Sequence, residues 1–263
     1  MKFTRPLNPA VAASLSSEDR FEYLKYYESI RGESLQEYAG SWSFEDWCNY
    51  ARTKNNFTAA GRNYVSEEDD ITHYVSERLN ATGSEIEKFT YFWETASPFS
   101  QWHRSAFIAP SYIRADDFSR VLTENGFSAR TEFSSAEQYM MYAKAMLFVD
   151  LDAAQAILAE HDPRKVKALG RSVRWYREET WQTFRWELVA QGNRCKFEQN
   201  PGIKEELLAT RGTTIVEASP HDKIWGIGLR ASDEAAAQRA TWQGKNLLGE
   251  VLTQLRVELA GGY

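Results

Sequence analysis

Apolar residues in the second half of the chain recur at the spacing of an α-helix, which restricts the possible folds more than any other feature. In the stretch 134–150 they stand at positions 136, 139, 140, 143, 146 and 147, along one helical face. Residues 178–191 show the same pattern, and Gly192 with Asn193 predicts the end of that helix. Pro163, directly after Asp162, predicts the first position of another helix.

Three further helices and three strands are predicted. Helices are expected at 153–160, 203–210 and 246–260, where apolar residues again keep to one face. Runs rich in aromatic or β-branched residues predict strands at 89–93, 106–108 and 213–218. The sequence therefore predicts a mainly α fold with a small β element.

Charge and polarity divide the chain near residue 85. Residues 1–88 carry 10 basic and 15 acidic side chains, a net charge of −5, whereas the other 175 residues carry 21 and 22, a net charge of −1. Short helices are expected around 18–31 and 43–53, in a part too aromatic for a disordered tail. We expect a helical N-terminal extension, 1–88, that packs on a core domain, 89–263.

Composition argues against several functional classes. A net charge of −6 over 263 residues is not that of a protein that coats nucleic acid by charge alone. No segment approaches the roughly 18 consecutive apolar residues of a membrane span. The four histidines and two cysteines do not stand at metal-ligand spacing, so we expect neither metal nor cofactor. Cys48 and Cys195 are too few for a disulfide framework, which predicts a reducing compartment, the cytoplasm or the nucleus.

Five segments carry polar, aromatic and glycine residues that helix formation does not require. They are 92-FWETASPFSQWH-103, 134-SSAEQYMMYAKAMLF-148, 169-LGRSV-173, 196-KFEQNP-201 and 217-EASPHDKIWGIGL-229, followed by 242-WQGKNLLG-249. In this order they resemble the NADAR family, also called YbiA-like, over about residues 89–258. The resemblance implies a compact helical domain and N-glycosidase activity on ribosyl C1–N bonds. The substrates it implies are unstable riboflavin-pathway intermediates or ADP-ribosylated guanine in nucleic acid.

Glu137 has two interpretations. It follows Ser134 by three residues, so its carboxylate fits a capping box at the start of the helix. The resemblance instead assigns it to catalysis, and cleavage of a C–N bond needs an acid for the leaving base or a base for water. Lys144 lies seven residues on, about two helical turns, so both charges share one side of the helix.

Lys144 is expected to be catalytic because it matches the family motif. It can hold a phosphate as a point charge, or its amine can attack C1 of the sugar and form an imine. The sequence does not choose between these two roles.

Trp225, Gly226 and Trp181 are candidates for the wall of a base-binding pocket, although tryptophans are also common core residues. The glycine lets the backbone approach a ligand, and a neighbouring indole can stack on a flat base. Some family members carry an aspartate between the two glycines, where this chain has Ile227. Asp222 is then the nearby candidate carboxylate.

Further substrate contacts are expected from residues beside loops and helix starts. Arg171, Lys245 and Asn246 are candidates for phosphate and ribose, although Asn246 also fits an ordinary helix N-cap. Phe99 and Ser100 belong to a tight loop, and Phe99 is expected to stack on the base.

The leading hypothesis is an N-glycosidase that acts on a ribosyl-phosphate or ADP-ribose-linked small molecule, or on modified nucleic acid, without a membrane partner. The sequence leaves the oligomeric state open, with a monomer favoured. The alternative is a non-catalytic ADP-ribose or nucleotide-binding module with the same pocket. The presence of both Glu137 and Lys144 favours the enzyme. A third hypothesis makes residues 1–88 a partner-binding module.

Overall fold

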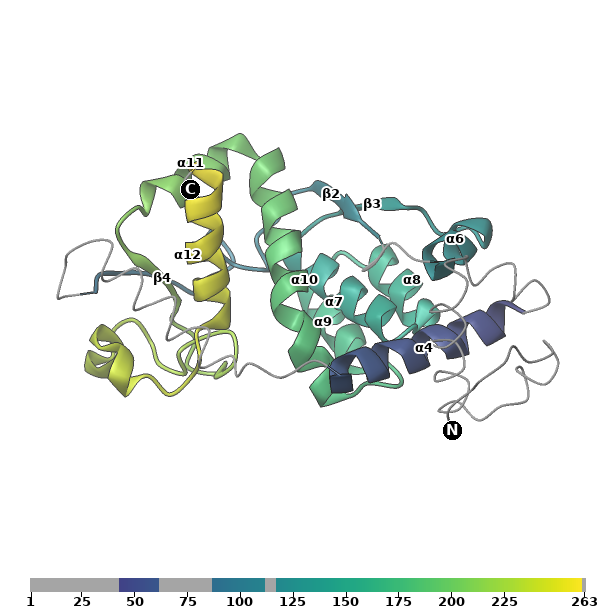
Figure 1. Cartoon of the computed structure of the whole chain (residues 1–263). Coiled ribbons are helices and arrows are strands. Elements are labelled where there is room, and N and C mark those ends of the chain that lie inside the picture. Colours follow the sequence, from purple (N-terminus) through teal and green to yellow (C-terminus); the bar gives the residue numbers. More distant parts are fainter. Residues whose placement is uncertain (1–42, 62–86, 112–116, 262–263) are drawn as a thin grey trace.

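The structure is a computed structural model that describes residues 43–61, 87–111 and 117–261 (Figure 1). Within these residues it is mainly helical with a small β component, which confirms the predicted fold class. The α-helices are α4 (Phe44–Gly61), α6 (Asp117–Glu124), α7 (Ala136–Leu147), α8 (Leu151–Ala159), α9 (Pro163–Arg171), α10 (Glu178–Gln199), α11 (Pro201–Ala209) and α12 (Leu247–Leu259). Among the described helices none is long and apolar enough to cross a membrane.

Four short strands form two separate pairs in the described part of the chain. β1 (Phe89–Phe92) pairs in parallel with β4 (Thr214–Glu217), so that Phe92 lies opposite Glu217. β2 (Phe107–Pro110) pairs antiparallel with β3 (Arg130–Phe133). The sequence did not predict β3, because its residues Arg-Thr-Glu-Phe are mostly polar and only Phe133 is buried.

Helix α7 lies at the centre and packs against α8, α9 and α10. Helix α10 lies between α7 and α12, and α12 covers β4, as Figure 1 shows. The largest side chains of the core come from several of these elements and include Tyr142, Phe133, Phe197 and Ile157. Helix α12 thus lies between β4 and α10 and contacts both.

Helix α10 does not end at Gly192 and Asn193, where the sequence predicted its end; it continues to Gln199. The glycine serves a close helix contact instead, because a Cβ at position 192 would lie 2.4 Å from the Tyr139 ring. Asn193 is fully buried and donates from Nδ2 to the carbonyl of Val189 at 2.9 Å, so it continues the helix.

Helix α4 belongs to the predicted N-terminal extension and contacts α6 and α10. The helix predicted at 43–53 is present and extends to Gly61, whereas the one predicted at 18–31 lies outside the described residues. Trp47 and Tyr50 are buried in the main core. Arg52 donates to the carbonyl of Val149 at 3.1 Å and lies 3.8 Å above the Trp175 ring. The domain boundary at residue 88 stays a prediction.

Candidate active site

A cavity of about 760 Å³ lies among the loop after β1, helices α7 and α9, and the loop after β4. Its lining combines carboxylic acids, cations and tryptophans, which are Glu94, Glu137, Glu217, Asp222, Lys167, Arg171, Trp93, Trp102 and Trp225. Such volumes are typical of pockets for small organic ligands. This cavity is the candidate active site.

The start of α7 explains why Glu137 is not a capping residue. Ser135 is the N-cap, and its hydroxyl accepts from the backbone N–H of Gln138 at 3.2 Å. Gln138 Oε1 in turn accepts from the backbone N–H of Ser134 at 2.8 Å. The capping pair is therefore one residue further along than the sequence suggested, and the side chain of Glu137 has no part in it.

The Glu137 side chain is instead buried at the cavity wall. The residue is 5% exposed, and its Oε1 atom has no hydrogen-bond partner. Its backbone N–H donates to the carbonyl of Gln101 at 2.9 Å, which fixes the helix start against the loop after β1. Burial raises the pKa of Glu137 to about 7, and the positive charge of Lys167 opposes that rise only in part.

Glu217 is a second carboxylic acid in the same cavity; the residue is half-buried, and the sequence analysis did not single it out. It is the last residue of β4, and its Oε2 atom is buried without a hydrogen-bond partner. Burial, together with the negative charges of Asp222 and Glu137, raises its pKa to about 8. Its position at the end of a buried strand, and at the start of the segment 217–229, was the available signal.

Glu137 and Glu217 line the same cavity, and the charge of Glu137 contributes to the raised pKa of Glu217. A protonated carboxyl can donate a proton to a leaving group, and an ionised one can accept a proton from water. The arrangement therefore suits hydrolysis by general acid and base catalysis.

Two cations of α9 line the cavity. Arg171, a predicted phosphate contact, lies there and is exposed. Lys167, one helical turn earlier, was not predicted; its Nζ lies 5.8 Å from the centre of the Trp102 ring. Both cations are available for an anionic group of a ligand.

The predicted aromatic contacts divide between the cavity and the core. Trp225 lines the cavity, together with Trp93 and Trp102, which the sequence analysis had not chosen. Trp181 is buried in the core, and Phe99 packs edge-on against Phe92 with ring centres 5.7 Å apart. Neither of these two lines the cavity.

Lys144 is not among the residues that line the cavity with Glu137. Its Nζ donates to the carbonyl of Gly170 at 2.8 Å and lies 4.2 Å above the Tyr176 ring. Burial lowers the pKa of Lys144. The catalytic role that the resemblance implies for this lysine stays a prediction.

Asp222 and Ser100 line the cavity as predicted. Asp222 Oδ1 accepts from the backbone N–H of Ile224 at 2.9 Å and of Trp225 at 2.8 Å, which shapes the loop that carries the tryptophan. The Ser100 hydroxyl accepts from the backbone N–H of Trp102 at 3.2 Å. Both residues therefore support a tryptophan of the wall.

Gly226, Lys245 and Asn246 do not line the cavity. Gly226 packs against backbone, because a Cβ there would lie 2.8 Å from the carbonyl oxygen of Glu217. Lys245 is exposed, and Asn246 is fully buried with its side-chain amide bonded inside the fold.

Lys196, from the segment 196–201, is fully buried and holds the loop after β1. Its Nζ donates to the carbonyls of Pro98 at 2.6 Å and Ser100 at 3.0 Å. Burial lowers the pKa of Lys196 to about 7. Among the described residues, no group of three or more His, Cys, Asp or Glu could hold a metal ion.

Comparison with known proteins shows which family this chain belongs to. The NADAR domain model matches residues 91–260. The chain is 42% identical over 160 residues to N-glycosidase R617 of Acanthamoeba polyphaga mimivirus, which covers 61% of this chain and 86% of that protein. It is 37% identical over 191 residues to Protein irg-1 of Caenorhabditis elegans, 71% of this chain and 84% of that protein.

A further relative is Riboflavin biosynthesis protein PYRR, chloroplastic, of Arabidopsis thaliana, which is 34% identical over 114 residues, 42% of this chain and 17% of that protein. The family match covers well over half of the chain and includes every cavity residue discussed above. The chain is an N-glycosidase and belongs to the NADAR domain family.

Proposed function

We propose that this N-glycosidase hydrolyses the ribosyl C1–N bond of a base linked to phosphoribose or ADP-ribose. The observation that carries the proposal is the pair of carboxyl groups of Glu137 and Glu217, each with a buried oxygen that has no hydrogen-bond partner in the fold. Unpartnered buried polar atoms cost stability, so their retention in a cavity supports a role toward a ligand.

In the proposed reaction Glu217 holds a proton, because burial raises the pKa of its carboxyl well above the ordinary value. It gives that proton to the base nitrogen while the C1–N bond breaks, and the bonding electron pair leaves with the nitrogen. The oxygen of a water molecule bonds to C1, and the water proton passes to the ionised Glu137. Return of this proton to Glu217 restores the pair. The products are the free sugar with a C1 hydroxyl and the protonated base.

The other cavity residues suit the two ends of such a substrate. Lys167 and Arg171 carry the positive charge that a phosphate requires. Trp225, Trp102 and Trp93 provide flat apolar faces for a base, and stacking on one is worth about 1–3 kcal/mol. Asp222 adds a third carboxylate beside the pair.

The substrate belongs to one of two classes. The name of the plant relative connects that protein with riboflavin biosynthesis, which supports a small phosphoribosyl intermediate. ADP-ribosylated guanine would need a second phosphate site and a groove for adenosine, and the volume of about 760 Å³ is large enough for more than a ribose phosphate. Both cysteines are free and buried, which supports a reducing compartment such as the cytoplasm.

A non-catalytic reader of ADP-ribose or nucleotide is the second candidate, because the same cations and tryptophans would serve it. Two carboxyl groups with raised pKa values argue against this alternative. A reader of an anionic ligand gains nothing from acids in its pocket, whereas hydrolysis requires them.

The test is to incubate the protein with both substrate classes and to detect released ribose 5-phosphate or ADP-ribose by mass spectrometry. Glu217→Gln is the matched inactive control, since it keeps the size of the side chain and removes the transferable proton. Release by the wild type alone would support the proposal. Binding of either ligand without release would favour the reader.

A further inference from the structure

We infer that Asn246 is a positioning residue for Glu217, the proposed acid, rather than a contact for phosphate or ribose. The inference rests on the proposed function, because it assigns Asn246 to the geometry of that reaction. It starts from a buried side chain that the proposed chemistry does not use. Asn246 is fully buried and precedes α12, yet its amide makes no cap bond to the helix.

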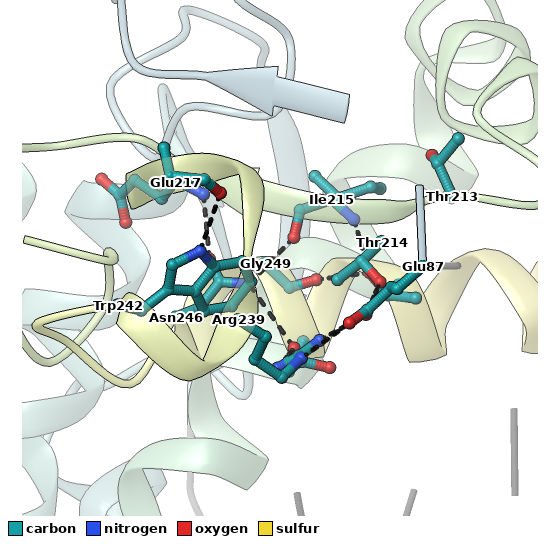
Figure 2. Close-up of polar contacts among 12 residues, drawn as sticks. Glu87, Thr213, Thr214, Ile215, Glu217, Arg239, Trp242, Asn246 and Gly249 are labelled. Carbon is teal, nitrogen blue, oxygen red and sulfur yellow. Dashed lines mark hydrogen bonds and ion pairs between the residues drawn. The ribbon is translucent and has the colours of Figure 1, made fainter. Parts of the chain in front are cut away.

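The amide of Asn246 holds the end of β4 through two hydrogen bonds. Its Oδ1 accepts from the backbone N–H of Glu217 at 2.9 Å, and its Nδ2 donates to the carbonyl of Ile215 at 3.0 Å. Its own backbone N–H donates to the carbonyl of Gly226 at 3.1 Å. Figure 2 shows the amide beneath the strand, with the Glu217 carboxylate extending away from it. One side chain thus fixes the backbone from which the carboxylate projects.

The local backbone explains why asparagine occupies this position. Asn246 has φ 56° and ψ 32°, a left-handed conformation that glycine adopts freely and asparagine tolerates better than most residues. Glycine has no amide to hold the strand. Gly249 leaves the necessary space, because a Cβ there would lie 2.5 Å from both side-chain atoms of the Asn246 amide. Asn246 and Gly249, both from the segment 242–249, therefore act together to hold the end of β4.

A second layer of charged groups supports the amide. Glu250 Oε1 lies 3.5 Å from Asn246 Nδ2 and 2.7 Å from Arg239 Nη1. Arg239 also pairs with Glu87 at 2.7 Å, just before β1, as the dashed lines in Figure 2 show. The position of the Glu217 backbone is thus connected to α12 and to both parallel strands. Catalytic groups need such support, since a displacement of about 1 Å can cost about 100-fold in rate.

The test compares Asn246→Gly with Thr253→Val. Thr253 lies on the same helix and is fully buried, and its hydroxyl accepts from the backbone N–H of Ile215 at 2.9 Å, so it also joins α12 to β4. Its hydroxyl bonds to the backbone of Ile215 and Gly249 and not to that of Glu217. Both variants should lose stability to a similar extent. Asn246→Gly should lower kcat about 10-fold or more with KM changed less than about threefold, whereas Thr253→Val should keep the kcat of the folded protein.

A second variant covers the case in which Asn246→Gly does not fold. Asn246→Asp keeps the shape of the side chain and the acceptor for the Glu217 N–H, and it loses the donor to the Ile215 carbonyl. Its kcat should therefore lie between that of the wild type and that of Asn246→Gly. Equal kcat per folded molecule in the Asn246 and Thr253 variants would overturn the inference.

Failure of the proposed function has a different signature, namely a wild type without turnover on any ribosyl substrate. In that case the titration of the Glu217 carboxyl, followed by carbon-13 NMR, decides the inference alone. Its midpoint should move in Asn246→Gly and stay in place in Thr253→Val. An unmoved midpoint in Asn246→Gly would overturn the inference.

Discussion

Replacement of Glu137 by glutamine should stabilise the protein at alkaline pH while it removes turnover. The buried carboxyl loses solvation when it ionises, so its pKa rises from the ordinary value of 4.5 to about 7. Between these two values the folded protein binds more protons than the unfolded chain, and stability falls as the pH rises. The full penalty is present above the folded pKa, and it is absent below about pH 4.5.

The expected size follows from that difference. A rise from 4.5 to about 7 corresponds to about 3 kcal/mol, since one pKa unit is about 1.4 kcal/mol. The amide of glutamine carries no charge, but its nitrogen brings a buried donor that costs about 1–2 kcal/mol if it stays unpaired. We therefore expect Glu137→Gln to gain about 1–3 kcal/mol at pH 8.5 and to gain nothing near pH 5.

Urea unfolding at both pH values, followed by tryptophan fluorescence, measures the gain. Turnover of the same preparations should fall at least ~100-fold, the scale of a lost general acid or base. Glu132→Gln is the control, because Glu132 is exposed on β3 and should change neither quantity. A Glu137→Gln variant that loses similar stability at both pH values while it keeps its activity would refute the reasoning, since the carboxylate would then be structural.

Three further predictions concern the cations and the extension. Arg171→Met and Lys167→Met should raise KM for a phosphorylated substrate several-fold with kcat nearly kept, as steady-state kinetics would show; an unchanged KM would argue against phosphate binding. Lys144→Met should lower turnover, because its ammonium holds the carbonyl beside Arg171, and borohydride trapping decides whether it also forms an imine; unchanged kcat and KM would contradict both roles. Deletion of 1–85 removes α4 with buried Trp47, so the melting temperature should fall and selectivity between the two substrate classes should change; an equally stable and equally selective 86–263 would show that the extension is a tethered module.

Local periodicity was sufficient to predict most of the helices, because each one needs only its own apolar face, but α6 was not predicted. The structure places α7 and α12 within a few residues of their predicted ranges, and α9 begins at Pro163 as predicted. Helix α10 was predicted too short, since Gly192 looks like a helix end in the sequence, and only the approach of Tyr139 shows its purpose. Strand β3 was missed because a polar edge has no strong pattern.

The site was predicted only in part, because local sequence patterns do not show which distant residues share a cavity. Glu137 stood in a recognisable segment, but adjacent pairs Ser134–Ser135 and Glu137–Gln138 made the capping alternative plausible until the bonds were known. The two glutamates are 80 positions apart, and no local pattern indicates that they share a cavity. Asn246 was expected to contact phosphate or ribose or to cap a helix, and the sequence could not indicate that its side chain is fully buried, because burial is a tertiary property.

The parallel pairing of β1 with β4 has a consequence for synthesis on the ribosome. Phe92 of β1 pairs with residue 217, so the partner strand is made 125 positions later. At roughly 5–20 residues per second, β1 waits about 6–25 s before β4 has been made. The helices α7 to α10 complete earlier and can assemble first, since their contacts are more local. The proposed catalytic pair is therefore among the last features to form, and we expect a nascent chain that stops before β4 to lack activity.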